Sequence, residues 1–421
     1  MTRSKIPDVR LHDIDDLRLH SRMYDAVIDD VDGRRIRIGD DWLVDWASCN
    51  YLGLDLDEEV IAAVEPALRR WGTHPGWSRM LGNPRLYPDI EERMTELLGS
   101  GNTLLLPTIS QIHLSVIPAL AGQGTLIIES RAHKTIYDGC VFARGLGATL
   151  KRFRSKRFDE LEALLRDVTA RPVMVWIDGV NSMTGDIPDL PEYVRLCREY
   201  GALLYVDDAH GFGVIGERSP EEPSPYGRRG NSIVRHTAES YQDIVLVGGF
   251  SKAYSSLLAF LALPTSVKDH LKVAAAPYLY SGPSPVASLA TVLAGLDVND
   301  KRGDDLRTHL WALTRRLLSH VRALGIHTLN TDGTPIVELP ISPDHDLIAV
   351  SEKLWSAGHY VTLAPYPGVP RDEVGFRVQL TSAHTLEQVD ALNAVLTDLA
   401  AEGALRRSIP AQRAASRLRR R

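Results

Sequence analysis

The chain is poor in cysteine, and the few cysteines that it has are scattered. Only Cys49, Cys140 and Cys197 occur among 421 residues, and none belongs to a Cys-x-x-Cys pair. An odd, sparse set of this kind excludes a disulfide framework and favours a reducing compartment, so we expect a cytoplasmic protein. Histidine and carboxylate residues also lack metal-ligand spacing, so no metal is expected.

Long apolar runs and strong net charge are lacking as well. No stretch approaches the ~18 apolar residues that span a bilayer, and the N-terminus turns polar where a signal peptide turns apolar. We therefore expect no membrane partner and no export. The formal net charge of −6 does not call for nucleic acid. Neither a Gly-x-Gly-x-x-Gly after the first strand nor a Walker loop occurs, which argues against nucleotide-binding classes.

Short apolar runs alternate with helical patterns through the middle of the chain. The runs occupy residues 125–128, 172–177, 202–206 and 244–247, and apolar residues recur at helical spacing within 191–200. Near-continuous β-branched runs separated by helices are typical of a buried, mostly parallel sheet. The sequence therefore predicts an α/β fold.

The composition divides the chain into segments. A length of 421 residues indicates two or three domains. The predicted segments are a polar arm with some helix (1–45), a large α/β domain (46–295), a smaller C-terminal α/β domain (296–404) and a basic, disordered tail (405–421). Two further expectations are a long surface loop at 217–242, rich in Pro, Gly and Arg, and an Ala- and Leu-rich helix that begins at 284–297.

Chemically suggestive side chains follow three of the predicted strands. Asp207 closes one strand, while Ser182 and Lys252 each follow another across a short turn. Ligands of parallel α/β sheets bind beyond the carboxyl ends of the strands. A lysine that can form an imine and a carboxylate that keeps a pyridine nitrogen protonated suit pyridoxal 5′-phosphate (PLP), with His133 and His210 nearby.

Each of these residues also has a structural interpretation. Lys252 follows two glycines and fits a solvated loop charge, Asp207 fits a helix cap, and the two histidines fit polar residues at the edge of the core. Spacing alone therefore predicts an α/β enzyme, with PLP as one possibility.

Seven segments, in order, resemble motifs of the α-oxoamine synthases. This family includes 8-amino-7-oxononanoate synthase, 5-aminolevulinate synthase, 2-amino-3-ketobutyrate CoA ligase and serine palmitoyltransferase. The matching segments are 50–54, 78–83, 132–139, 179–186, 206–217 with Asp-Asp-Ala-His-Gly, 251–253 with Ser-Lys-Ala, and 377–385. The resemblance covers about residues 45–390. It implies a fold-type I PLP-dependent transferase, similar to aspartate aminotransferase, that is a homodimer with active sites at the subunit interface.

The resemblance also implies catalytic roles. Lys252 would hold PLP as a Schiff base and later serve as the general base. Asp207 would pair with the pyridinium nitrogen, His210 would hydrogen-bond the phenolic oxygen, and His133 would stack on the ring.

Further residues are expected around the cofactor and the substrate by the same resemblance. The additional cofactor-binding candidates are Thr108, Ile109, Ser110, Ser182, Ser251 and, on a segment that reaches the partner subunit, Ser281 and Gly282. Arg377 would bind the amino-acid carboxylate, with Asn50 close to the substrate and Arg22 as a weaker candidate.

Several positions depart from the family pattern. The usual Ser-Gly-aromatic turn around the PLP phosphate is Thr108-Ile109-Ser110 here, and the threonine before the Schiff-base motif is Gly249. Tyr87 replaces a common histidine, and Gly282 replaces a threonine. Because glycine is lost from the phosphate turn, the site is expected to depend more on the hydroxyls of Thr108 and Ser110. The chain is thus identified as a divergent member.

The resemblance implies condensation of an amino acid with an acyl thioester, carried by coenzyme A or a carrier protein, usually with decarboxylation to an α-aminoketone. Two alternatives stay open. One is other PLP chemistry on the same scaffold, such as transamination or another carbon–carbon bond formation at Cα. The other is a catalytically dead homologue that serves as a scaffold.

Overall fold

The computed structural model describes residues 12–408, which form two compact units. The large unit comprises Cys49–Ser182 and Asp186–Trp311. The small unit comprises, among the described residues, 12–48, Met183–Gly185 and 312–408. The division of the chain at residues 45, 295 and 404 stays a prediction.

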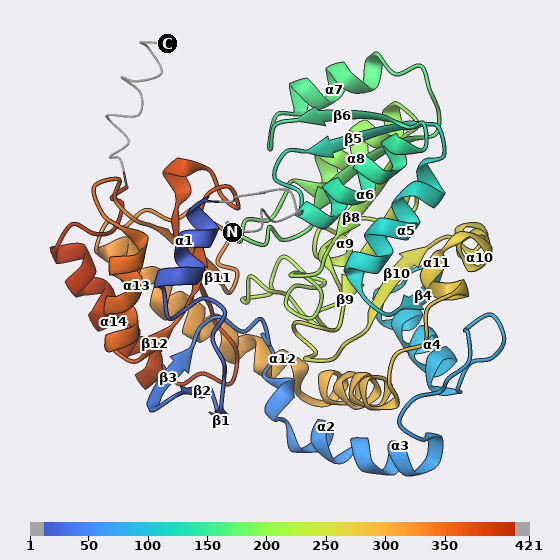
Figure 1. Ribbon diagram of the computed structural model, residues 1–421. Helices are drawn as coiled ribbons and strands as arrows, with labels where there is room; N and C mark the ends of the chain where they lie inside the picture. Colours follow the sequence, from blue (N-terminus) through green and yellow to red (C-terminus); the bar gives the residue numbers. More distant parts are fainter. Residues whose placement is uncertain (1–11, 409–421) are drawn as a thin grey trace, which may run out of the picture. The chain divides into compact units, whose positions relative to one another are not determined.

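The large unit is built on a seven-stranded sheet with the strand order β4-β10-β9-β8-β7-β5-β6 (Figure 1). Its strands are β4 (Asn102–Leu106), β5 (Thr125–Glu129), β6 (Thr149–Phe153), β7 (Val173–Asp178), β8 (Leu203–Asp207), β9 (Ile244–Gly249) and β10 (Ala259–Leu263). Strands β5 to β9 pair in parallel, whereas β10 pairs antiparallel with both β4 and β9. The four predicted apolar runs form β5, β7, β8 and β9, which confirms the mostly parallel sheet.

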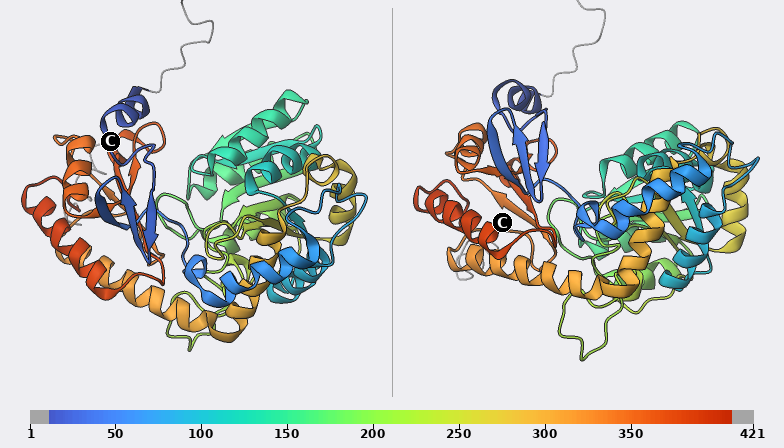
Figure 2. Two further views of the ribbon diagram at one scale, coloured as in Figure 1. Left: turned by 60° about the horizontal axis from the view of Figure 1, so that its bottom comes forward. Right: turned by 90° about the horizontal axis from the view of Figure 1, so that it is seen from below.

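Helices pack against this sheet. Those of the large unit are η1 (Leu54–Leu56), α2 (Glu58–Ala62), α3 (Val64–Trp71), α4 (Leu86–Leu98), α5 (Ile109–Ala121), α6 (Lys134–Gly145), α7 (Phe158–Arg166), α8 (Leu190–Glu199), α9 (Ile233–His236), α10 (Thr265–Ala274), α11 (Ala276–Leu279) and the first part of α12 (Val286–Ala323). The helix predicted at 191–200 is α8. Helix α12, orange in Figure 2, continues unbroken well past the predicted 284–297.

The packing of α5 against α6 depends on one glycine. A β-carbon on Gly139 of α6 would lie 2.4 Å from the carbonyl oxygen of His113 in α5, so only glycine permits this approach. Ile112 and Val116 of α5 pack with Ile136 of α6 in the core beneath the sheet. This close contact fixes the spacing of α5 and α6, and with it the positions of their first turns relative to one another.

Part of the predicted surface loop at 217–242 is buried, which corrects the sequence interpretation. Asn231, Ser232 and the start of α9 are fully buried. The reason is polar anchoring, because the backbone N–H of Ile233 donates to Asp208 and the Asn231 amide donates to the carbonyl of Leu97. The polar composition of residues 217–242 therefore led to the wrong prediction that the whole segment is exposed.

The small unit contains two sheets. One has the order β1-β2-β3-β12, with β1 (Asp30–Asp32), β2 (Arg35–Ile38), β3 (Asp41–Asp45) and β12 (His359–Tyr360). The other has the order β11-β14-β13, with β11 (Ile336–Pro340), β13 (Thr362–Ala364) and β14 (Gly375–Gln379). Its helices are α1 (His12–His20), α13 (Leu347–Ser356), η2 (Arg371–Glu373), α14 (Leu386–Ala401) and the end of α12.

Both ends of the chain hold more structure than predicted. The arm contains three strands besides its helix, and each is only three to five residues long, which is too short for a clear apolar alternation in the sequence. Of the predicted tail, Leu405 bridges Ile341 and Arg407 bridges Ile326, because the buried Leu405 anchors the segment. The rest of that tail, from residue 409 on, lies outside the described residues.

No helix within residues 12–408 is long and apolar enough to cross a membrane.

Candidate active site

A cavity of about 180 Å³ opens in the large unit, where β7 and β8 end and where the turn after β9 begins. Most of its lining was predicted from the sequence. The lining residues are Thr108, Ile109, Ser110, His133, Thr135, Asp178, Val180, Ser182, Asp207, Ala209, His210, Ser251 and Lys252. The structure therefore brings the predicted lysine, carboxylate and histidines to one place.

An aromatic cluster fixes the turn that carries Lys252. Phe250 packs edge-on against Phe212 and Tyr254, and all three rings are buried. The backbone N–H of Ser255 donates to the carbonyl of Lys252, which closes the turn. Lys252 itself is half-buried, so its amine stands at the cavity on a rigid support.

Asp207 ends strand β8 and is 5% exposed. Its Oδ1 accepts a hydrogen bond from the backbone N–H of Ala209 at 3.0 Å. Its Oδ2 lies 3.5 Å from Nε2 of His113, which is buried in α5. Burial lowers the pKa of His113 to about 4, so this imidazole is neutral near pH 7.

His210 is oriented by a tyrosine. The hydroxyl of Tyr51 lies 2.7 Å from Nδ1 of His210, and both side chains are buried. A hydrogen bond at one ring nitrogen sets the tautomer and the direction of the other nitrogen. Tyr51 therefore fixes how His210 stands at the cavity.

His133 caps the start of α6. Its backbone N–H donates to Oδ1 of Asp178 at 2.9 Å, and its Nδ1 lies 2.8 Å from Oγ1 of Thr135. Burial raises the pKa of Asp178 well above its ordinary value, and the negative charge of Asp207 adds to the effect. The shift favours the neutral form of Asp178.

Helix α5 points its N-terminus at the cavity. The N-cap is Thr108, whose hydroxyl accepts from the backbone N–H of Gln111, and Ser110 follows in the first turn. Unpaired N–H groups and the helix dipole make such a terminus suited to a phosphate.

Ile109 also fills space beside Gly249, where a β-carbon would lie 2.6 Å from Cδ1 of Ile109.

The donor set fits PLP on these observations. Lys252 offers an amine for the aldehyde, Asp207 offers a buried carboxylate for the ring nitrogen, and the start of α5 offers hydroxyl and N–H donors for the phosphate. Across the described residues, no group of three or more His, Cys, Asp or Glu side chains has metal-binding geometry.

Other predicted residues lie elsewhere in the described part of the chain. Asn50, Ser281 and Gly282 belong to the large unit but are outside the lining of this cavity. A β-carbon on Gly282 would lie 3.3 Å from Nε2 of His74. The departure at Tyr87 has a structural role, because its hydroxyl accepts from the backbone N–H of Ser284.

The two predicted arginines belong to the small unit. Arg377 in β14 lies opposite the fully buried Glu338 of β11, and its Nη1 lies 3.5 Å from the sulfur of Met183. Arg22 is exposed and donates to Glu352 at 2.7 Å and to Asp41 at 3.3 Å. These ion pairs favour a structural role for Arg22, and its substrate role stays a prediction.

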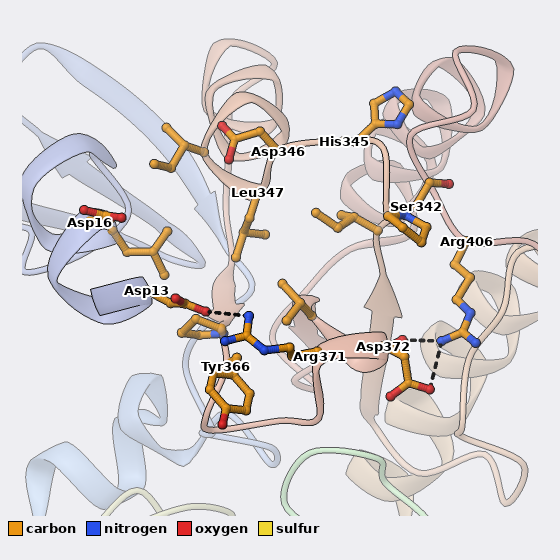
Figure 3. A pocket seen from close by; sticks show the side chains of 16 residues that line it. Asp13, Asp16, Ser342, His345, Asp346, Leu347, Tyr366, Arg371, Asp372 and Arg406 are labelled. Atoms are coloured by element: carbon orange, nitrogen blue, oxygen red, sulfur yellow. Dashed lines mark hydrogen bonds and ion pairs between the residues drawn. The ribbon is translucent and has the colours of Figure 1, made fainter. Parts of the chain in front are cut away.

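A second cavity, of about 410 Å³, lies within the small unit (Figure 3). Its charged residues largely satisfy one another, because Arg371 pairs with Asp13 and lies over the ring of Tyr366, while Arg406 pairs with Asp372. Its described lining contains no lysine. It therefore does not compete with the first cavity as a PLP site.

Sequence reasoning missed four residues near the first cavity, namely Tyr51, His113, Thr135 and Asp178. Tyr51 and Thr135 fall inside matched motif segments, and His113 follows the phosphate turn. Tyr51 contacts His210, Asp178 contacts His133, and His113 contacts Thr135, so these contacts join separate segments and residue spacing could not predict them.

The comparisons with known proteins agree with this geometry. The family model for aminotransferase class I and II matches residues 42–396. A putative 8-amino-7-oxononanoate synthase of Desulforudis audaxviator is 34% identical over 82% of this chain and 86% of its own length. The 8-amino-7-oxononanoate synthase of Marinobacter nauticus is 34% identical over 83% of this chain and 85% of its own.

Solved structures give the same result. The serine palmitoyltransferase of Sphingomonas wittichii superposes with a TM-score of 0.82 at 28% identity, covering 91% of this chain and 94% of that one. A serine palmitoyltransferase from S. paucimobilis with bound PLP–myriocin aldimine superposes with a TM-score of 0.81 at 25% identity, covering 89% and 91%. The chain belongs to the α-oxoamine synthase family of fold-type I, PLP-dependent enzymes, within aminotransferase class I and II.

Proposed function

We propose that this protein is a PLP-dependent acyltransferase that condenses an amino acid with an acyl thioester and gives an α-aminoketone. The observation that carries the proposal is the convergence of Lys252, Asp207 and His133 on one cavity. A lysine amine, a buried carboxylate and a flanking imidazole are what PLP chemistry at an amino-acid Cα requires.

When bound, PLP supplies an aldehyde that captures an amine and a ring that accepts electrons from the substrate Cα. Asp207 would hold a proton on the ring nitrogen, because its buried carboxylate lines the cavity. Lys252 takes the Cα proton as the general base. His210, fixed by Tyr51, donates to the phenolic oxygen. His133 covers one face of the site.

The phosphate is held by the start of α5. Thr108 and Ser110 supply hydroxyls, and the first N–H groups of the helix supply donors and a favourable dipole. Ser182 and Ser251 complete the polar surround of the cofactor.

Roles on the substrate side are carried over from the family. Arg377 binds the amino-acid carboxylate and Asn50 lies close to the substrate, while Arg22 is the weaker candidate. The thioester is acyl coenzyme A or an acyl carrier protein, and loss of carbon dioxide follows the new carbon–carbon bond. We place the reaction in the cytoplasm.

Panels of amino acids and acyl thioesters, offered to the PLP-loaded enzyme, test the proposal. Thiol release that needs both substrates, together with an α-aminoketone in the mass spectrum, is the expected result. Conversion of PLP to pyridoxamine phosphate without thiol release would replace the proposal with transamination. Absence of PLP binding would favour a scaffold protein.

We also propose that the active form is a homodimer. The segment Tyr280-Ser281-Gly282 resembles the one that family members send to the partner's cofactor phosphate, and Tyr280 is 84% exposed. Met80 and Leu81 are exposed as well, at 64% and 82%, on a segment whose Ser78 hydroxyl donates to the carbonyl of Leu279. Exposed apolar side chains that lie together are typical of surfaces that contact another protein chain. Sedimentation at assay concentration should find a dimer, and an active monomer would contradict this.

A further inference from the structure

His113 connects two sides of the PLP cavity without lining it. Its Nε2 lies 3.5 Å from Oδ2 of Asp207, and its Nδ1 lies 2.8 Å from Oγ1 of Thr135. The same Oγ1 lies 2.8 Å from Nδ1 of His133. A continuous line of polar atoms therefore runs from Asp207 to His133 through two residues to which the family pattern assigns no role.

The surroundings hold this line in place. His113 is fully buried, and Gly139 lets α6 approach its backbone closely. The ring of Tyr205 lies against the imidazole, with centroids 5.9 Å apart. His113 and Thr135 thus sit on two helices whose spacing cannot change freely.

The imidazole of His113 carries a single proton. Burial lowers its pKa to about 4 against the opposing effect of the Asp207 carboxylate. A neutral imidazole donates at one nitrogen and accepts at the other. Nε2 makes no hydrogen bond to Asp207 at 3.5 Å, but an ionised carboxylate at that distance still attracts an N–H and repels a lone pair. Beside an ionised Asp207 the proton therefore belongs on Nε2.

The position of this proton sets the direction of the two hydrogen bonds that the Thr135 hydroxyl makes with His113 and His133. Once Nδ1 of His113 is an acceptor, the Thr135 hydroxyl donates to it. The oxygen of that hydroxyl then accepts from Nδ1–H of His133. The backbone N–H of Thr135 also approaches this nitrogen, at 3.4 Å, and would suit the opposite tautomer, but the hydroxyl contact of 2.8 Å is shorter and stronger.

We propose that His113 and Thr135 are positioning residues that make the tautomer of His133 depend on the charge of Asp207. An ionised Asp207 puts the proton of His133 on Nδ1 and leaves Nε2 as an acceptor. A protonated Asp207 would remove this attraction, so that the hydrogen bonds from His113 through Thr135 to His133 could reverse. The inference rests on the proposed function only in that Asp207 and His133 flank PLP.

Nitrogen NMR of the holoenzyme, labelled with ¹⁵N-histidine, tests the proposal directly. At neutral pH the wild type should hold His113 as the Nε2–H tautomer and His133 as the Nδ1–H tautomer, with His133→Gln and His113→Asn providing the assignments. Any other combination of tautomers overturns the proposal. This readout needs no substrate, so it stands or falls apart from the condensation reaction.

Variants of Thr135 separate the proposed role from simple packing. Thr135→Val removes the hydroxyl at nearly constant volume and should leave His133 as a mixture of tautomers, with kcat roughly 3- to 10-fold lower and the amino-acid KM unchanged. Thr135→Ser keeps the hydroxyl and should restore both the single tautomer of His133 and kcat. Thr308→Val, at an exposed threonine that bonds only its own helix, is the matched control. An unchanged His133 tautomer in Thr135→Val overturns the proposal, and if that variant does not fold the wild-type tautomers still decide.

Discussion

Tyr51 and His210 form a buried pair in which the phenol oxygen lies 2.7 Å from Nδ1 of the imidazole. The pair joins the N-terminal motif to the motif after β8, which are far apart in the sequence. It explains how a histidine at a strand end keeps one orientation beside the cofactor.

Tyr51→Phe should therefore lower kcat while leaving the fold intact. Loss of one buried hydrogen bond costs about 0.5–1.5 kcal/mol, which corresponds to roughly a 3- to 10-fold slower reaction. Steady-state kinetics and circular dichroism measure both effects. Tyr200→Phe, which removes a half-buried hydroxyl that bonds Glu162 outside the cavity lining, is the control and should leave kcat unchanged. Equal kcat in wild type and Tyr51→Phe would refute the orienting role.

Lys252→Ala should abolish covalent attachment of PLP and keep the protein folded. The aromatic cluster that supports the turn does not include the lysine, so its truncation leaves the packing unchanged. Borohydride reduction followed by peptide mass spectrometry should label Lys252 in the wild type and no lysine in the variant. Lys301→Ala, at an exposed site, should label normally. A label on another lysine would show the assignment to be wrong.

Asp207→Asn should retain some PLP and lose most activity. An amide cannot stabilise a proton on the ring nitrogen, and the loss of a buried charge partner worth about 3–4 kcal/mol slows the reaction roughly 10²- to 10³-fold. The control is Asp243→Asn, because Asp243 directly precedes β9, at the end of that strand away from the cavity. The decisive measurement is kcat at saturating PLP, and near-wild-type turnover would disprove the role of Asp207.

Arg377 tests the carry-over from the family most directly. Arg377→Ala should weaken amino-acid binding by about 2–5 kcal/mol, the range for truncating one partner of a buried charge pair, with PLP content unchanged. Lysine should rescue only partly, because it lacks the bidentate fork. Glu338 lies opposite Arg377 in the sheet and supplies the rival interpretation, a structural ion pair. If Arg377 forms a structural ion pair instead, Arg377→Ala should lower the melting temperature and leave the affinity for the amino acid unchanged. Glu338→Gln should then have the same two effects.

The stability of the protein should fall in acid partly through His384. Burial lowers the pKa of this histidine to about 4, and its ring accepts from the N–H of Thr381 and donates to the carbonyl of Asp45. The unfolded chain binds the proton more readily, so this contribution, about 3 kcal/mol, is complete above pH 6.5 and is lost as pH falls toward 4.

His384→Gln can make the same two hydrogen bonds without titrating, so its melting temperature should depend less on pH between 4 and 6.5 than that of the wild type. Scanning calorimetry across this range gives the comparison, with the exposed His20→Gln as control. Parallel curves for wild type and His384→Gln would exclude the histidine as the source.

The sheet and most of the cavity could be predicted because both depend on local patterns. Apolar runs marked the buried strands, and the ends of parallel strands gather at one edge, which brought Asp207 and Lys252 together. Matched motifs supplied His133 and His210.

Other features depend on contacts that spacing does not encode. The strands at residues 30–45 are only three to five residues long, so the alternation that β2 shows as Arg-Ile-Arg-Ile is too brief to mark a strand among the surrounding polar residues. The buried turn at Asn231 is held by hydrogen bonds from distant segments, and its polar composition suggested a surface. Tyr51 contacts His210 and His113 contacts Thr135 and Asp207, and these contacts between separate segments are revealed only by the folded structure.

Ile109 and Gly249 link the two departures from the family pattern. The isoleucine side chain occupies the space that a side chain at Gly249 would need. A threonine introduced at Gly249 would therefore force Ile109 into another rotamer, at the mouth of the helix that is expected to hold the phosphate. The two positions form one structural unit, and exchanging both together is expected to disturb this turn less than exchanging Gly249 alone.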